Sequence, residues 1–362
     1  MSGEQAIAPG ARFLDYDVVR LLGRGGMSEV YLVCRAGSLY ALKLLSPDLA
    51  RTNPEYIKRF LREAKIAMRL RHPNLVAVHD VGYSKEFDRH YLLMDYIDGY
   101  DLRSAIAMGG AMDVNSAVLV VVAVASVLEA GETLGLVHRD IKPENIMVEN
   151  DGTIKLLDLG VAKARGTDSL HTMQRTVFGT PNYISPEQAQ DASTVDSRAD
   201  VYSLGVVFYE MLSGRRPYEC DRPRDVLARL LSPEELPDVR EKNPAVPEKL
   251  AAVLRLMLAK DPAKRIESAS KLLEVLKRLG YGVPERPGGA LAPSKTIRPA
   301  FSYLSYSTAK ANRTLSFDTK DKEIQSFVAS LKTRRRGERL LRLVAVSIAV
   351  VFAIAVLVKF VF

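Results

Sequence analysis

A short stretch near the middle of the chain concentrates side chains that could transfer a phosphoryl group. Asp140, Lys142 and Asn145 fall within six residues, bracketed by apolar residues that predict a loop pinned to a core. Asp158 follows thirteen residues after Asn145. Phosphoryl transfer needs metal ions, a base or orienting group for the attacking hydroxyl, and neutralisation of charge. Carboxylate and amide oxygens of this kind suit Mg²⁺, and Lys142 adds a cation.

A glycine-rich segment near the N-terminus is the first element expected to position such chemistry. Gly23, Gly25 and Gly26 lie between two apolar, β-branched stretches, which predicts a hairpin with a glycine-rich tip. Glycines allow backbone N–H groups to approach phosphate oxygens without a Cβ in the way. Taken alone, such a segment is more often an ordinary turn. It is not a Walker loop, because no Gly-Lys-Ser/Thr opens a helix.

Two further charged residues stand in apolar surroundings downstream of this hairpin. Lys43 interrupts an apolar strand pattern, and a buried lysine needs an anionic partner such as a nucleotide phosphate. Residues 55–71 predict an amphipathic helix, with Glu63 at the edge of its apolar face. That face consists of Ile57, Phe60, Leu61, Ala64 and Ala67. Taken singly, Lys43 and Glu63 would each be interpreted as an ordinary exposed residue. Only their order along the chain, together with the other motifs, indicates a function.

That order resembles the protein kinase family. A Gly-rich loop, Ala-Leu-Lys, a helical Glu, His-Arg-Asp-x-Lys-x-x-Asn and Asp-x-Gly follow one another at the family's spacings over about three quarters of the chain. The sequence looks most like the bacterial, membrane-anchored serine/threonine kinases of eukaryotic (Hanks) type. The resemblance implies an α+β, bilobal protein-kinase fold, with a small β-rich N-lobe holding one key helix and a large, mainly helical C-lobe. We expect a kinase domain at 14–280, a flexible juxtamembrane linker at 281–339 and a transmembrane helix at 340–362.

The resemblance also implies roles for individual residues, with ATP and Mg²⁺ as cofactors and Mn²⁺ as an alternative metal. Lys43 would hold the α/β-phosphates and pair with Glu63; Asp140 would orient or deprotonate the substrate hydroxyl. Lys142 would steady the γ-phosphate. Asn145 and Asp158 would bind the metal. The residues expected around ATP are Leu22, Gly23, Arg24, Gly25, Gly26, Met27, Ser28, Glu29, Val30, Ala41, Lys43, Met94, Asp95 and Ile97.

Later segments fit the same family map. Thr180 and Glu187 resemble the end of an activation segment that meets the substrate, with Glu187 pairing with Arg265. Asp200 would brace the catalytic loop from the central helix of the large lobe. Lys142 together with Thr180 resembles the serine/threonine branch of the family.

Two positions depart from the family pattern. Ser28 replaces the third glycine of the loop, and Leu159 replaces the phenylalanine of Asp-Phe-Gly, which leaves the behaviour of an inactive state open. Neither change removes a metal ligand or a charge, so we expect an active kinase.

Regulation is expected in the activation segment. Arg139, beside Asp140, is a cation that a phosphate on this segment could neutralise, and the segment would become ordered. Thr172 and Thr176 are the candidates for autophosphorylation, the alternative being that these hydroxyls only solvate a loop.

The net charge of +8 belongs to the C-terminal part of the chain. Residues 1–285 carry 37 Lys+Arg and 39 Asp+Glu, whereas residues 286–342 carry 13 and 4. A basic excess confined to one tail gives no support to nucleic-acid binding by the main body. Two cysteines without metal-ligand spacing exclude a disulfide framework and a structural zinc site.

The chain ends in an apolar segment that could cross a membrane. Residues 343–358 contain no charge, and as a helix residues 340–362 would reach about 34 Å, enough for a hydrocarbon core of ~30 Å. A buried C-terminal helix is the alternative, although no polar face remains. Basic residues at 334–342 would place the kinase domain in the cytoplasm, on the inner face of a bacterial membrane, and would contact anionic lipid. A second apolar run at 117–128 is too short to span and predicts a buried core helix.

Two other functions compete with an active, membrane-proximal protein kinase. A tethered pseudokinase scaffold would predict loss of Lys43, Asp140, Asn145 or Asp158, and all four are present. A small-molecule kinase of similar fold is disfavoured by the Gly-Thr and Ser-Pro-Glu of the activation segment, which point to a protein substrate. Homodimerisation is a further possible interaction, without a Gly-x-x-x-Gly in the apolar segment to mark it.

Overall fold

The computed structural model describes residues 7–25, 28–52, 54–157, 182–191, 195–220 and 222–281, except for the side chains of residues 49, 55, 59 and 63. They divide into two compact units, each of which is described by itself. The first contains the described residues of Met1–Gly23 and Val30–Tyr40, and the second those of Arg24–Glu29 and Ala41–Ala300. The expected linker, apart from its first residue, and the expected transmembrane helix lie outside the described residues.

The first unit is built from antiparallel strands. Its hydrogen-bonded order is β1 (Arg12–Phe13), β2 (Tyr16–Arg24), β3 (Ser28–Arg35) and the start of β4 (Ser38–Leu45). Ala36 and Gly37, both with positive φ, make the two-residue turn that right-handed strand twist favours between β3 and β4. Strands β2 and β3 flank the glycine-rich segment, which confirms the predicted hairpin.

The second unit begins with the rest of this sheet and one helix pair. The end of β4 is followed in hydrogen-bonded order by β6 (Arg89–Asp95) and β5 (Val78–Ser84). Helices α1 (Pro47–Thr52) and α2 (Pro54–Ala67) follow β4 along the chain. The apolar side of α2 is buried at Ile57, Phe60, Ala64 and Ala67, as its periodicity predicts.

Helix α2 is shorter than the sequence pattern suggests. We expected a helix over 55–71, but it ends at Ala67, and Leu70 N donates to Ala67 O in a tighter turn. Pro73 follows closely, and a proline disfavours helical backbone in the residue before it. The charge-rich end of the pattern therefore belongs to a connector and not to the helix.

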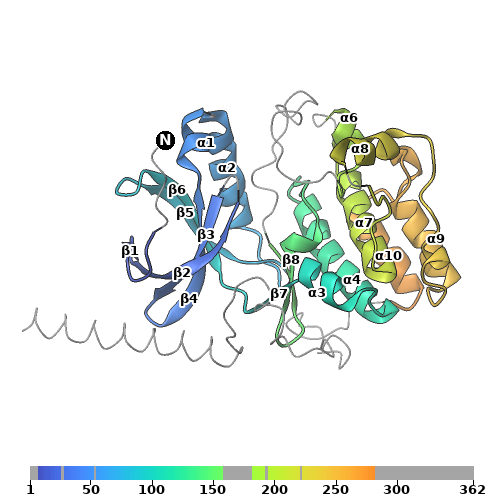
Figure 1. Ribbon diagram of the computed structural model, residues 1–362, viewed down its shortest axis with the longest axis horizontal. Helices are drawn as coiled ribbons and strands as arrows, with labels where there is room; N and C mark the ends of the chain where they lie inside the picture. The colour runs from blue at the N-terminus through green and yellow to red at the C-terminus, as the bar shows by residue number, and fades with distance from the viewer. Residues whose placement is uncertain are drawn as a thin grey trace, which may run out of the picture. The chain divides into compact units, whose positions relative to one another are not determined.

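A mainly helical region forms the rest of the second unit (Figure 1). It opens with a small antiparallel sheet in the order β7-β8-β9 and continues with helices that pack around α4 and α7. Its elements are β7 (Gly99–Asp101), α3 (Leu102–Gly109), α4 (Val114–Glu132), η1 (Pro143–Asn145), β8 (Ile146–Glu149), β9 (Ile154–Leu156), α6 (Pro186–Gln190), α7 (Arg198–Ser213), α8 (Pro223–Leu231), η3 (Val239–Glu241), α9 (Glu248–Met257), η4 (Pro262–Lys264) and α10 (Ala269–Arg278).

Helix α4 is the core of this region. Its side chains are buried on nearly every side, and it contacts α7, α10 and β9. Among the described residues it is the one helix long and apolar enough to cross a membrane by length and composition. Its burial confirms the expected core helix, although it extends beyond residues 117–128 because Asp113 caps its first turn by accepting from Ser116 N at 2.9 Å.

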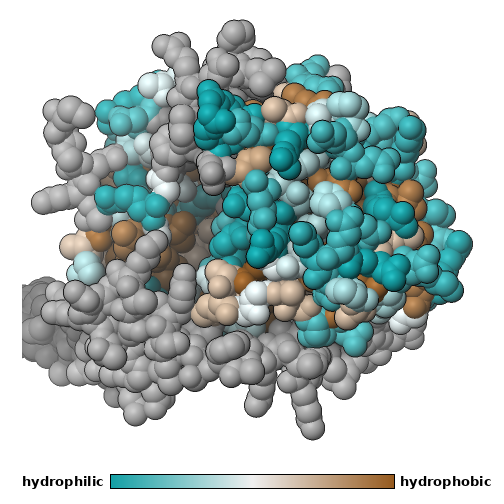
Figure 2. Space-filling view, turned by 45° about the vertical axis from the view of Figure 1, so that its right-hand side comes forward, coloured by the Kyte–Doolittle hydropathy of each residue, from teal (hydrophilic) through white to brown (hydrophobic). Residues whose placement is uncertain are grey.

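The surface of the helical region is mostly hydrophilic, with small hydrophobic patches between the polar side chains (Figure 2). Both cysteines are free thiols. The β-sheet part and the helical part together confirm the α+β fold class predicted from the sequence.

Candidate functional site

The loop of residues 138–145 brings together two of the predicted catalytic side chains and one predicted metal ligand. Lys142 Nζ donates to Asp140 Oδ2 at 2.8 Å. Asn145 Nδ2 donates to the same oxygen at 3.0 Å and to Asp140 O at 2.8 Å. The amide nitrogen of Asn145 thus faces Asp140, which leaves its Oδ1 as the atom suited to a cation. A carboxylate, an ammonium and an amide oxygen therefore meet within one turn of chain.

Asp200 of α7 holds this loop by its backbone. Its two carboxylate oxygens accept the N–H groups of His138 and Arg139, each at 2.7 Å. Burial raises the pKa of Asp200, an effect that the charges and N–H groups of these two residues oppose. The paired bonds confirm the predicted bracing role, and they support the positive φ of 65° at Arg139.

Arg139 is buried and links the loop to Gln188 and Val195, which lie further along the chain. Its Nη2 donates to Val195 O at 3.3 Å, and its own carbonyl accepts from Gln188 Nε2 at 3.2 Å. Gln188 lies in α6, where it forms a capping box with Ser185. The Gln188 contact could not be predicted from the sequence, because it depends on how α6 is oriented.

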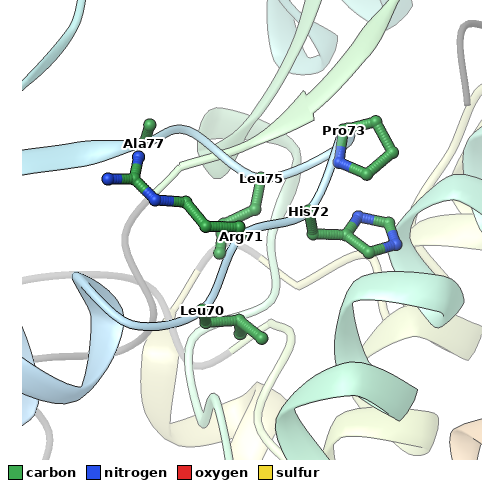
Figure 3. A pocket seen from close by; sticks show the side chains of 6 residues that line it. All are labelled: Leu70, Arg71, His72, Pro73, Leu75 and Ala77. Atoms are coloured by element: carbon green, nitrogen blue, oxygen red, sulfur yellow. The ribbon is translucent and has the colours of Figure 1, made fainter. Parts of the chain in front are cut away.

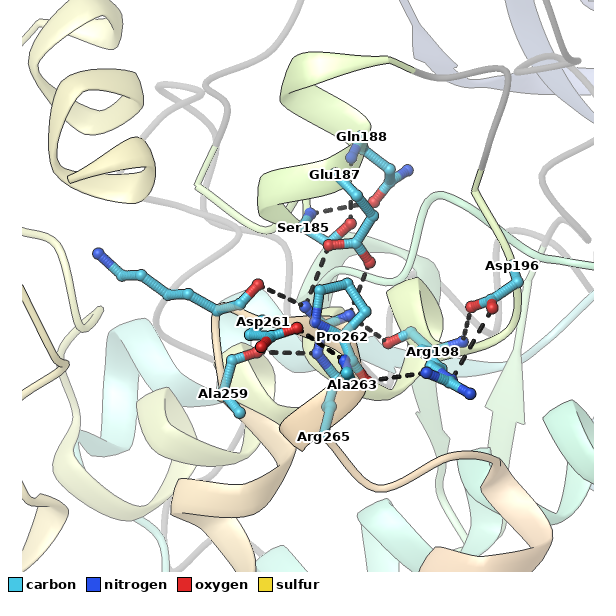
Figure 4. Close-up of polar contacts among 11 residues, drawn as sticks. Ser185, Glu187, Gln188, Asp196, Arg198, Ala259, Asp261, Pro262, Ala263 and Arg265 are labelled. Carbon is cyan, nitrogen blue, oxygen red and sulfur yellow. Dashed lines mark hydrogen bonds and ion pairs between the residues drawn. The ribbon is translucent and has the colours of Figure 1, made fainter. Parts of the chain in front are cut away.

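Glu187 and Arg265 form the ion pair that the sequence predicts (Figure 4). The two nitrogens Nη1 and Nη2 of Arg265 donate to the two carboxylate oxygens at 2.6 and 3.0 Å. The Arg265 side chain is fully buried and also donates to Arg198 O and Ala259 O. A bidentate pair with its remaining donors satisfied is the geometry in which a buried charge is tolerated. It attaches α6 to the chain before α10.

A second polar cluster was missed by sequence reasoning. Arg103 of α3 reaches Glu144 at 2.9 Å and Glu210 at 2.7 Å, and it also contacts the hydroxyl and ring of Tyr183. Tyr183 donates to the other oxygen of Glu210 at 2.6 Å. Burial raises the pKa of Glu210, and Arg103 works against this. The cluster could not be predicted because its four residues come from four separate segments of the chain. The one indication in the sequence was the position of Glu144 between Asp140 and Asn145.

The residues expected around ATP are distributed over both units. Leu22, Gly23 and Val30 belong to the first unit, and Ala41 and Lys43 lie on the part of β4 in the second. Met94 and Ile97 are buried beside Asp95 at the end of β6. Asp95 N donates to Ala77 O at 3.0 Å, and its carboxylate contacts His79 Nε2 at 2.5 Å.

Several predicted residues cannot be placed. Glu63 lies in α2, but its side chain is not described, so its pairing with Lys43 stays a prediction. The others lie outside the described residues: Gly26, Met27, Asp158, Leu159, Thr172, Thr176 and Thr180. Within the described part of the chain no three His, Cys, Asp or Glu side chains gather as a metal site.

A cavity of about 310 Å³ lies in the connector between α2 and β5 (Figure 3). Its lining residues are Leu70, Arg71, His72, Pro73, Leu75 and Ala77. None of them is a predicted site residue. His72 Nδ1 accepts from Asn74 N at 3.1 Å, and burial lowers the pKa of this imidazole.

The comparisons with known proteins agree with the family resemblance of the motifs. The model of the protein kinase domain family matches residues 16–275. The serine/threonine-protein kinase PknB of Mycolicibacterium smegmatis is 38% identical over 278 residues, which cover 75% of this chain and 44% of PknB. PrkC of Bacillus subtilis is 35% identical over 259 residues, covering 71% and 39%. The chain thus spans less than half the length of these relatives. The crystal structure of the Mycobacterium tuberculosis PknI kinase domain superposes with a TM-score of 0.60 and 32% identity, covering 76% of this chain and all of that one.

Proposed function

The chain belongs to the protein kinase family, and from this premise we propose that it transfers the γ-phosphate of ATP to serine and threonine hydroxyls of proteins, itself included. The observation that carries the proposal is the contact of Lys142 and Asn145 with the carboxylate of Asp140. A protein with the kinase fold but without activity would not need these three side chains in contact.

The roles proposed for these residues follow from their chemistry. Asp140 accepts the hydrogen bond of the substrate hydroxyl and orients its oxygen toward the γ-phosphate. Lys142, held beside it, offsets negative charge that develops during transfer. Asp200 keeps the loop in this geometry through two backbone bonds.

ATP and a divalent metal fit the residues that are present. Asn145 turns its Nδ2 toward Asp140, so its Oδ1 is the natural ligand for a hard cation such as Mg²⁺, together with Asp158. The metal supplies neutralisation of phosphate charge when bound. Lys43 would hold the phosphates and pair with Glu63, while Met94, Asp95 and Ile97 would line the adenine side.

Phosphorylation of the activation segment is proposed as the regulatory step. Arg139 is buried and anchored to Val195 and Gln188, so a phosphate on Thr172 or Thr176 that reached its guanidinium would add a charge-assisted contact. Mass spectrometry of the protein incubated with ATP and Mg²⁺ tests this. Modification at either threonine is expected, and the absence of phosphate at both would refute it.

The location proposed for the kinase is the cytoplasmic face of a membrane. Support comes from the apolar residues 343–358 and the basic residues 334–342 before them, which favour a single span and contact with anionic lipid. Protein substrates near the membrane, and a homodimer, are the partners consistent with this placement.

Transfer of labelled phosphate to a generic protein substrate tests the proposed activity. The intact chain is compared with Asp140→Asn, and the modified amino acids are identified after hydrolysis. We expect phosphoserine and phosphothreonine from the intact chain only. Equal labelling by both proteins would refute the role of Asp140, and binding of ATP without any transfer would favour a pseudokinase scaffold.

A further inference from the structure

Glu29 is a buried carboxylate at one stem of the glycine-rich turn. It is 8% exposed and lies between two guanidinium groups. Arg24 Nη2 contacts its Oε1 at 2.6 Å, and Arg89 Nη2 contacts its Oε2 at 3.2 Å. Each carboxylate oxygen contacts one guanidinium, so two arginines neutralise the negative charge of Glu29. We call Arg24, Glu29 and Arg89 the stem clasp.

Arg89 is the fixed member of the stem clasp. It is the first residue of β6, is 8% exposed, and donates through Nε to Leu45 O at 2.6 Å. Leu45 is the last residue of β4, the strand that carries Lys43. One guanidinium therefore joins the start of β6, the end of β4 and the start of β3. A buried arginine is retained when such partners satisfy its donors.

The stem clasp connects the two stems of the turn to this fixed point. Arg24 directly precedes Gly25, and Glu29 directly follows Ser28. A backbone bond of 2.8 Å from Gly25 N to Ser28 O joins the same two stems. Glycines lose more conformational freedom on ordering than any other residue, so a loop built from them binds a ligand tightly only if something else limits its motion.

We propose that Arg89, which is not among the residues expected to touch ATP, is a positioning residue for nucleotide binding. Acting through Glu29 and Arg24, it fixes the spacing of Gly25 and Ser28 at the stems of the glycine-rich turn and thereby sets the affinity for the phosphates. The inference rests on the proposed ATP site. It adds to that site a residue on β6 that determines the affinity for ATP, at the opposite end of that strand from Met94 and Asp95.

The test is a nucleotide-binding comparison in the full chain. Arg89→Met alone leaves Glu29 charged and buried, so the main variant is the pair Glu29→Gln with Arg89→Met, which removes both charges and keeps the volumes. The matched control is Arg278→Met, which breaks the exposed ion pair with Glu274 on α10. The dissociation constant of ATP with Mg²⁺ is measured by calorimetry, along with kcat, the KM values for ATP and a protein substrate, and the melting temperature.

We expect the double variant to melt near the wild-type temperature and to raise Kd and KM for ATP about tenfold, with kcat and the KM for protein nearly unchanged. A role in stability alone would lower the melting temperature and leave both ATP constants unchanged, and that result overturns the proposal. If wild type binds ATP but transfers no phosphate, while the double variant binds it about tenfold more weakly, the stem clasp is supported and the proposed activity fails.

Arg24→Ala keeps the proposal testable if the double variant does not fold. Arg24 is half exposed, so its removal should leave the protein folded. A weaker affinity for ATP is expected, by about threefold. When Glu29→Gln is added, the total loss should be smaller than the product of the two single losses, because the Arg24–Glu29 contact is removed by either change. Unchanged affinity in Arg24→Ala, or losses that multiply in the pair, would overturn the proposal.

Discussion

The carboxylate of Asp200 shows how one buried side chain can fix the position of another that it does not touch. Its two oxygens hold the N–H groups of His138 and Arg139, directly before Asp140. The cost of burying the charge, visible in its raised pKa, is offset by these two bonds. The position of Asp140 therefore depends on α7 as much as on its own loop.

Asp200→Asn should impair both folding and transfer. The amide offers one acceptor oxygen where two N–H groups need one each, so one buried donor loses its partner. We expect about 1–3 kcal/mol less stability toward urea and, since the loop shifts, roughly tenfold to a hundredfold lower kcat. Asp225→Asn, in an exposed ion pair on α8, is the control and should change neither quantity. Wild-type values in Asp200→Asn would contradict the bracing role.

At the scale of elements, buried polar links decide how helices and connectors are placed. The Glu187–Arg265 pair attaches α6 to the chain before α10 and fixes the capped helix that also contacts the carbonyl of Arg139. The pair was predictable from the family resemblance. The Arg103 cluster was not, because α3, the catalytic loop, Tyr183 and α7 meet only once the chain is folded.

Arg265→Met should be among the most damaging changes away from the reacting groups. It leaves Glu187, largely shielded from water, without its counter-charge, which costs about 3–5 kcal/mol. The double variant Glu187→Gln with Arg265→Met removes the stranded charge and should recover part of that loss. Urea unfolding of the two variants measures the difference, and equal stability in both would show that the pair acts by packing alone.

The connector after α2 should give the protein a pH dependence. Burial lowers the pKa of His72 below its usual 6.5, so the unfolded chain takes up a proton at a higher pH than the folded one. Stability from the neutral imidazole is thus present above pH 6.5 and is lost as pH falls through the lowered pKa. In urea unfolding between about pH 8 and pH 5, His72→Asn should lose less stability than wild type. Parallel curves would contradict this.

At the scale of the whole molecule, periodicity and motif order predicted most of what the structure describes. The hairpin around the glycines, the buried helix α4 and the Asp140 loop follow from local patterns. The early end of α2 could not be predicted in this way. The helical pattern of the sequence continues past Ala67, whereas Pro73 disfavours helical backbone before it. The stem clasp was also missed, because Arg89 is sixty residues from Glu29 and a strand-initial arginine looks exposed in sequence.

The C-terminal part of the chain should determine where the protein is found. If residues 340–362 span a membrane, the full chain will sediment with membranes and resist extraction by high salt, since apolar contact is not screened. A truncation after residue 281 should appear in the soluble fraction with its transfer activity retained. Soluble full-length protein would contradict the anchor without affecting the kinase assignment.

The most direct test of the central claim is the rate of phosphate transfer measured together with ATP binding in Asp140→Asn. Asn keeps the volume but is a far weaker hydrogen-bond acceptor for a hydroxyl. We therefore predict that transfer to a protein substrate falls about 10²- to 10⁴-fold while the Kd for ATP with Mg²⁺ stays near the wild-type value. Transfer at the wild-type rate with this carboxylate removed would contradict the account.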